Sequence, residues 1–137
     1  MNRRYLLKHL VALMFFIFFT NTLGEKFHWD YTLWYFDIVM HSLGGAWVGL
    51  FFIYFFSRIG QAHPARKFFL KVFLASLLAG ILWEFYEFYI YQIVSLIRFD
   101  VVDVATDVVC DALGAGLAFL YYGKRIMAGE ENRVQSV

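Results

Sequence analysis

Long apolar segments separated by short polar connectors make up most of the chain. Four segments are each close to or longer than the roughly 20 residues that a helix needs to cross a bilayer. They cover about residues 5–23, 33–57, 68–90 and 101–123. The pattern predicts an all-α fold, in which residues 1–123 form a single domain of four transmembrane helices and residues 124–137 form a short polar tail.

The composition supports this class of protein. Of the 137 residues, 61% are hydrophobic and 22% are aromatic, whereas soluble domains contain roughly 45–50% apolar residues. A soluble domain of this length does not bury so much apolar surface. The single Cys110 excludes an intramolecular disulfide and a cysteine-based metal site. A net charge of +1 without a basic run argues against a nucleic-acid partner.

Basic residues predict how the four spans are oriented. They precede the first span, fill the connector between the second and third spans, and follow the fourth span. All of these positions fall on one side of a four-span bundle, and the positive side is the cytoplasmic one. We therefore expect a multi-pass protein of the bacterial inner membrane with both termini in the cytoplasm. The residues concerned are Arg3, Arg4, Lys8, Arg58, Arg66, Lys67, Lys71, Lys124 and Arg125.

The first apolar segment has a second interpretation. A basic start, an apolar stretch over residues 10–19 and small residues at Thr22 and Gly24 also fit a cleaved signal peptide. Its removal would leave three spans and would not change the orientation of the rest.

Ionisable residues recur at helical spacing in three of the predicted spans. Side chains three or four positions apart share a helix face. With the orientation above, all of them occupy the outer half of the membrane. A charge that faced lipid there would cost at least roughly 2.5–3.5 kcal/mol, so we expect them to face one another inside the bundle. They are Asp37 and His41 in the second span, Glu84 and Glu87 in the third, and Asp103, Asp107 and Asp111 in the fourth.

Six carboxylates and one imidazole cannot all be charged in a small, partly dry cavity. Either several carboxyl groups stay protonated, or a cation neutralises them. Oxygen ligands with one nitrogen suit Mg²⁺, Mn²⁺, Ca²⁺ or Zn²⁺. We expect His41, Glu84, Asp107 and Asp111 as ligands, and His41, Glu84 and Asp107 as catalytic candidates. Further ligands or supporting groups are Asp37, Glu87, Asp103 and Arg98, the last as a cation that pairs with an outer acid.

Simpler interpretations exist for the outermost residues. Asp37 and Asp103 stand near predicted helix starts, where an acid commonly caps the helix, and Glu87 is near enough to the surface to reach water. Asp107, Asp111 and Glu84 lie too deep for these explanations.

Three motifs resemble the VanZ-like superfamily and its uncharacterised, acid-rich relatives among bacterial inner-membrane proteins. They are DIVMH from Asp37, WEFYE from Trp83, and the stretch RFDVVDVATDVVCDALGAG that ends at Gly116. In that family an Asp-x-x-x-His pair precedes a Glu in the next span and an Asp-x-x-x-Asn/Asp-x-x-Gly stretch. Asp111 stands where VanZ-type members typically carry Asn, and Asp103 is additional. The resemblance implies a shared intramembrane polar site and names no reaction.

Three kinds of function fit such a site. The first is a metal-dependent enzyme acting on a membrane lipid or lipid-linked envelope molecule, because the site lies at head-group depth. The second is a proton- or cation-coupled carrier, although four spans without an internal repeat offer little for alternating access unless the chain forms a homo-oligomer. The third is a non-catalytic scaffold whose polar cluster sets the helix register. The sequence does not decide between an enzyme and a protein without catalytic activity.

Overall fold

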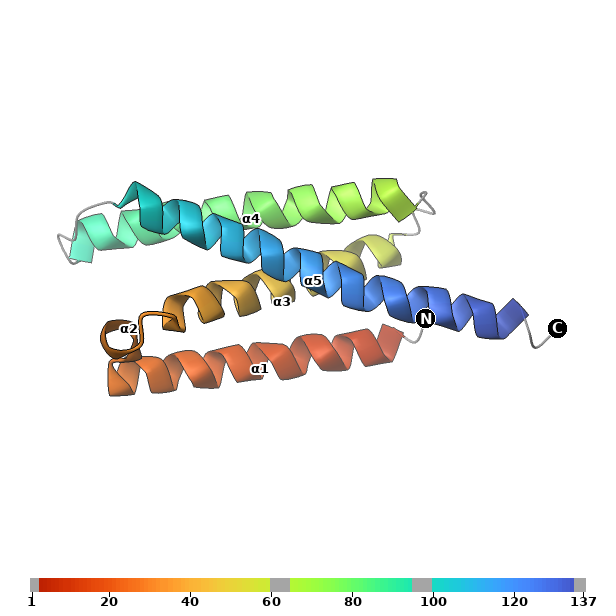
Figure 1. Ribbon diagram of the computed structural model, residues 1–137, viewed down its shortest axis with the longest axis horizontal. Helices are drawn as coiled ribbons and strands as arrows, with labels where there is room; N and C mark the ends of the chain where they lie inside the picture. The colour runs from red at the N-terminus through yellow and green to blue at the C-terminus, as the bar shows by residue number, and fades with distance from the viewer. Residues whose placement is uncertain (1–2, 60–64, 95–99, 135–137) are drawn as a thin grey trace.

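The computed structural model describes residues 3–59, 65–94 and 100–134. Within these ranges the chain forms five helices (Figure 1). In chain order they are α1 (Arg3–Phe27), α2 (Trp29–Thr32), α3 (Phe36–Arg58), α4 (Ala65–Val94) and α5 (Val101–Val134).

The four long helices run alternately up and down, and the start of α1 lies at the same end of the bundle as the last turns of α5 (Figure 1). We call this the terminal end, and the end that carries α2 the far end. Each long helix contains a stretch long and apolar enough to cross a membrane, at Arg4–Phe27, Phe36–Arg58, Arg66–Ile90 and Val101–Tyr122. The predicted all-α bundle of four spans is confirmed.

Large apolar side chains cover the outside of the bundle. Phe18, Phe85 and Leu117 are each more than half exposed, as are many other residues of the long helices. A soluble protein rarely exposes a continuous apolar surface of this kind, whereas a membrane protein presents one to the lipid. The exposed aromatic residues Tyr31 and Trp34 lie at the far end, as expected for residues at a membrane interface.

The closest helix packing joins α3 to α5 through small residues. A side chain on Gly45 would overlap the main chain of Asp111, and one on Gly114 would overlap the main-chain oxygen of Ser42. A turn further along, the Cβ position of Gly49 lies 2.8 Å from Cα of Ala115. Small residues allow this approach because no side chain separates the two backbones. The acidic stripe of α5 is thereby held against α3.

The half of the bundle near the terminal end has an apolar core. Ile53 and Val72 are fully buried in it. The Trp47 indole N–H of α3 donates a hydrogen bond to the Leu10 carbonyl of α1 at 3.0 Å, which ties α1 to the bundle. The core consists of Leu6, Leu10, Leu50, Ile53, Val72, Ala118 and Tyr122.

The helices extend beyond the predicted spans. α1 continues to Phe27, and the chain then reverses at His28, whose φ of 53° is left-handed. The expected polar connector therefore contains the last turn of α1 and the short α2. Trp29 of α2 lies edge-on to the ring of Phe36, which packs over Gly24. At the other end of the chain, α5 continues to Val134 through most of the predicted tail.

Candidate metal site

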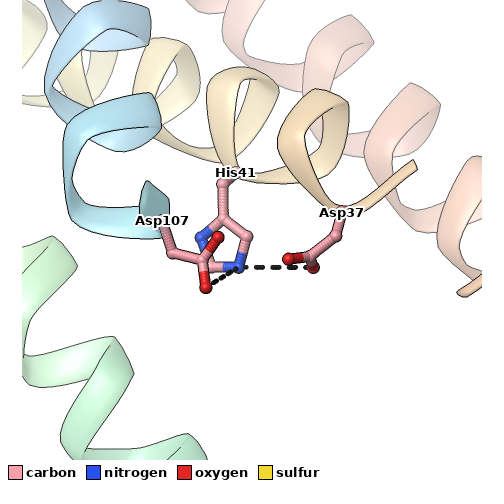
Figure 2. A group of neighbouring side chains, drawn as sticks. All are labelled: Asp37, His41 and Asp107. Carbon is pink, nitrogen blue, oxygen red and sulfur yellow. Dashed lines mark ion pairs between the residues drawn. The ribbon is translucent and has the colours of Figure 1, made fainter. Parts of the chain in front are cut away.

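His41 is the centre of a polar cluster that α3, α4 and α5 build in the far half of the bundle. Its Nε2 atom lies 3.6 Å from Asp37 Oδ1 and 3.9 Å from Asp107 Oδ2 (Figure 2). Its Nδ1 atom lies 3.7 Å from Asp111 Oδ1 and 3.8 Å from Glu84 Oε1. The structure brings together the four predicted ligands, with Asp37 beside them.

Glycines make room for this cluster. The missing side chain of Gly45 lets α5 approach α3 at Asp111. On α4, the Cβ position of Gly80 lies only 2.8 Å from Asp111 Oδ2, so any side chain at residue 80 would compete with that carboxylate. Glu84 stands one turn after Gly80 on the same face of α4. The three helices therefore approach one another at glycines, and the carboxylate side chains of the cluster occupy the space between them.

The distances around His41 are too long for hydrogen bonds. All four N···O separations fall between 3.6 and 3.9 Å, and a contact of 3.6 Å is no longer a hydrogen bond. Two ligands bonded to one metal at about 2.0–2.2 Å and a tetrahedral angle lie roughly 3.4 Å apart. The spacing is therefore close to that of ligands around an ion.

Two carboxylate oxygens of the cluster are buried without a partner. Glu84 and Asp107 are 7% and 4% exposed, and neither Glu84 Oε1 nor Asp107 Oδ1 has a hydrogen-bond partner within the described residues. Leaving such an oxygen unpaired costs about 1–3 kcal/mol, and more when it is charged. A positively charged group from outside the described residues would satisfy these oxygens, and a metal cation is one such group.

The remaining predicted site residues differ in how deeply they are buried and in how close they lie to His41. The Asp37 side chain is 54% exposed and closes the outer side of the cluster. Glu87 is half-buried and offers an oxygen near His41 and Glu84. Asp103 lies one turn before Asp107 but is exposed, and no ion pair joins it to His41 in the described part of the chain. Arg98 lies outside the described residues.

A cleft of about 610 Å³ connects the cluster to the surface of the bundle. One wall comes from α1 and is mostly apolar, with Met14, Ile17 and Phe18 beside the polar Asn21. The opposite wall carries Asp37, His41, Ser76, Glu87 and Asp111. The cleft is therefore amphipathic. On the other side of α4, a smaller cleft of about 390 Å³ has apolar walls and reaches Glu84.

Sequence reasoning missed Ser76, which lines the larger cleft on α4. It is 3% exposed, and its Oγ atom has no hydrogen-bond partner among the described residues. Ser76, Gly80 and Glu84 recur at every fourth position, so the helical spacing that identified the acids also leads to this hydroxyl group. Cys110 is buried but is not among the residues that meet around His41.

Comparison with known proteins identifies one family. Residues 1–128 match the model of the family described as "Predicted membrane protein (DUF2238)". No curated protein and no solved structure matches the chain.

Proposed function

We propose that this chain, which belongs to the DUF2238 family of membrane proteins, is a metal-dependent enzyme that acts on a lipid or lipid-linked molecule of the cell envelope. One observation carries the proposal. A buried histidine is surrounded by four carboxylates at 3.6–3.9 Å, and two buried oxygens of that group have no partner among the described residues. A divalent cation would neutralise part of the negative charge of these carboxylates and would bind to their oxygens.

His41, Glu84, Asp107 and Asp111 are the proposed ligands. Metal held within this set would activate a bound water molecule or neutralise a phosphate group of the substrate. His41, Glu84 and Asp107 would contact the bound metal and are therefore the proposed catalytic residues. Asp37 and Glu87 stand beside them and contribute further ligands or accept protons.

The cleft supports an amphiphilic substrate. Its polar wall carries the cluster, and its apolar wall on α1 offers Met14, Ile17 and Phe18 to a hydrocarbon chain. α1 and α4 do not pack against each other in the described residues, so a lipid has a lateral route to the site between them. A phosphate-containing head group fits best, because a cation on the acids would bind it.

Transport and scaffolding are less well supported. Beyond the cluster toward the terminal end, the interior is filled by apolar residues that include the fully buried Ile53 and Val72. An ion or proton path would have to cross that layer, and the cleft reaches Trp47 beside the layer but is lined by none of its buried residues. A scaffold would need a satisfied polar network, yet Glu84 Oε1 and Asp107 Oδ1 have no protein partner in the described chain.

The membrane setting belongs to the same proposal. The positive-inside rule puts the terminal end in the cytoplasm and the cluster in the outer half of a bacterial inner membrane. The order Asp37, His41, Glu84, Asp107, Asp111 along the chain supports a distant VanZ-like relationship with a shared polar site.

Metal content and lipid turnover test the proposal. We would purify wild type, Asp107→Asn and Asp111→Asn in detergent, measure bound metals by mass spectrometry, and record thermal unfolding with and without a chelator. Glu25→Gln is the matched control, because Glu25 is an exposed carboxylate of α1 outside the cluster. Each protein would then be incubated in nanodiscs of bacterial lipid, and the lipids would be analysed by mass spectrometry.

We expect wild type and Glu25→Gln to bind a divalent cation, to lose thermal stability with chelator, and to convert a lipid. Asp107→Asn and Asp111→Asn should fold, bind metal at least about 10–100-fold more weakly and lack turnover. A wild type that ignores both chelator and added divalent ions contradicts the metal site. A metal-loaded wild type that converts no lipid contradicts the enzymatic role, and stability that depends on pH alone favours a proton relay.

A further inference from the structure

The two ring nitrogens of His41 face different sets of carboxylates. Nε2 faces Asp37 and Asp107, at 3.6 and 3.9 Å. Nδ1 points the other way, toward Asp111 and Glu84, at 3.7 and 3.8 Å. A single ion bonded to one nitrogen cannot also reach the carboxylates on the opposite side of the ring. The cluster therefore has two halves that share one imidazole.

Each half is a complete set of potential ligands. One atom each of Asp37, His41 and Asp107 lie within 4.8 Å of one another, and so do atoms of His41, Glu84 and Glu87. Each half also contains one buried carboxylate oxygen that has no hydrogen-bond partner among the described residues. That oxygen is Asp107 Oδ1 in the first set and Glu84 Oε1 in the second. Because these two unpaired oxygens belong to different halves of the cluster, each needs a partner of its own.

The charge balance favours the same conclusion. Asp37, Glu84, Glu87, Asp107 and Asp111 are five carboxylates around one histidine. A single divalent cation would leave three of their negative charges uncompensated in a largely dry interior, where unpaired charge is costly. A second divalent cation lowers the excess from three charges to one, or to two when the imidazole between the ions has lost its proton.

We propose that the cluster binds two zinc-like cations, one on each side of the His41 ring, with the imidazole bridging them. The inference rests on the proposed function, because it deepens the same metal site. When both nitrogens bind metal, the imidazole gives up its one N–H proton to solvent and becomes a bridging imidazolate. Zinc fits this role because it accepts imidazole nitrogen together with carboxylate oxygen, whereas Mg²⁺ and Ca²⁺ favour oxygen alone.

The two positions differ in how many protein ligands they have. On the Nδ1 side, Glu84 and Asp111 face the ring, and Glu87 offers an oxygen within 4.8 Å of His41 and Glu84. His41 and these three carboxylates offer up to four protein ligands, the number found in a closed tetrahedral site. On the Nε2 side, Asp37 and Asp107 bring it to three, and the Asp37 side chain is 54% exposed. Zinc sites with three protein ligands and an open position are the catalytic kind. The outer ion therefore binds water and substrate, and the inner ion stays in place.

Metal stoichiometry tests the proposal. Detergent-purified protein would be saturated with zinc, freed of excess by gel filtration, and analysed for zinc per chain. Two paired variants each remove one half, Asp37→Asn with Asp107→Asn for the outer position and Glu84→Gln with Glu87→Gln for the inner one. Glu25→Gln is the control. Asp37→Asn alone is the variant least able to disturb folding, because its side chain is exposed.

We expect two zinc ions per chain in wild type and Glu25→Gln, and one in each paired variant. Asp37→Asn alone should weaken only one of the two ions, and a mild chelator should remove that ion first from wild type. In the copper-loaded protein the imidazolate bridge should couple the two ions, so the electron paramagnetic resonance intensity falls below the copper content. One ion per chain in wild type, or full resonance intensity at two coppers, overturns the bridged pair while the proposed function stands. No bound ion in wild type overturns both.

Discussion

At the scale of single residues, Ser57 and Ser76 differ in whether their hydroxyl groups have a hydrogen-bond partner. Ser76 Oγ is buried without a partner in the described residues, whereas Ser57 shares a hydrogen bond of 3.4 Å with the Tyr122 hydroxyl group. An unpaired buried hydroxyl costs about 1–3 kcal/mol, and a typical hydrogen bond contributes about 0.5–1.5 kcal/mol. In the ligand-free protein the unpaired hydroxyl group of Ser76 therefore destabilises the fold, whereas the hydrogen bond of Ser57 stabilises it.

We expect Ser76→Ala to raise the melting temperature of the ligand-free protein and Ser57→Ala to lower it. Ser76 lines the cleft, so the same Ser76→Ala substitution should weaken binding of the lipid that the cleft accepts. Differential scanning fluorimetry in detergent, followed by lipid titration, measures both effects. A drop in melting temperature for Ser76→Ala would mean that the hydroxyl group already has a partner in the free protein.

At the scale of helices, the contact between α3 and α5 positions half of the cluster. A side chain at Gly114 would meet the Ser42 carbonyl and the Ala46 nitrogen, both of them main-chain atoms of α3. Gly116, two positions along the same helix, has nothing within 4 Å of its Cβ position. The two glycines therefore form a matched pair, with one at the helix interface and one in open space.

Gly114→Ala should push α5 away from α3, lower thermal stability and weaken metal binding, because Asp107 and Asp111 move with α5. Gly116→Ala should be neutral or stabilising, since alanine favours a helix over glycine by about 0.8–1.0 kcal/mol. Thermal unfolding and zinc titration of both variants provide the measurement. Equal behaviour of the two would show that the close approach does not position the site.

The first helix also belongs to the bundle at this scale. Leu6 and Leu10 of α1 are buried in the apolar core, and Trp47 of α3 donates a hydrogen bond to the Leu10 carbonyl. A segment with such contacts is expected to remain in the mature protein. Intact mass spectrometry of protein purified through a C-terminal tag should therefore find residues 1–24 present. A mass that lacks them would favour the signal-peptide interpretation.

Trp47→Phe checks whether that hydrogen bond holds α1 in place. The substitution keeps an aromatic ring and removes the donor, so we expect a loss of about 0.5–1.5 kcal/mol and faster proteolysis of α1. Leu23→Ala, an exposed position of α1 that faces lipid, is the control and should be close to wild type.

At the scale of the whole molecule, the polar cluster lies in the far half, whereas most basic residues of the described helices lie near the terminal end and Lys26 lies at the far end. The start of α1, the end of α3 and the start of α4 lie at the terminal end, and the last turns of α5 project beyond them on the same side (Figure 1). Arg4, Arg58 and Arg66 belong to these segments. The positive-inside rule therefore predicts a cytoplasmic terminal end and a cluster near the outer surface.

Reporter fusions test this orientation in living bacteria. A reporter active only in the cytoplasm should work when fused after Val137, and one active only outside the cytoplasm should work when inserted before Asp100. The opposite result would show that the protein has the reverse orientation in the membrane. The cluster would then serve a molecule on the cytoplasmic side.

Hydrophobic patterning determined the class, the number of membrane spans and the shared face of the acids. These properties follow from local chemistry, because a span needs about 20 apolar residues and a helix repeats every 3.6 residues. The same local rules predicted that Asp37, His41, Glu84, Asp107 and Asp111 would meet, since membrane burial leaves charged groups only the interior.

The tertiary structure decided which residues are buried and which groups they face. Asp103 and Asp107 occupy one stripe, and the sequence separated them only by their depth in the span; the structure shows Asp107 buried beside His41 and Asp103 exposed. The orphaned hydroxyl group of Ser76, the room that Gly80 leaves for Asp111, and the separate carboxylates at the two nitrogens of His41 depend on which helices are neighbours. Helix periodicity gives the direction of a side chain but not its depth or its partner, because both are set by the packing of other helices against it.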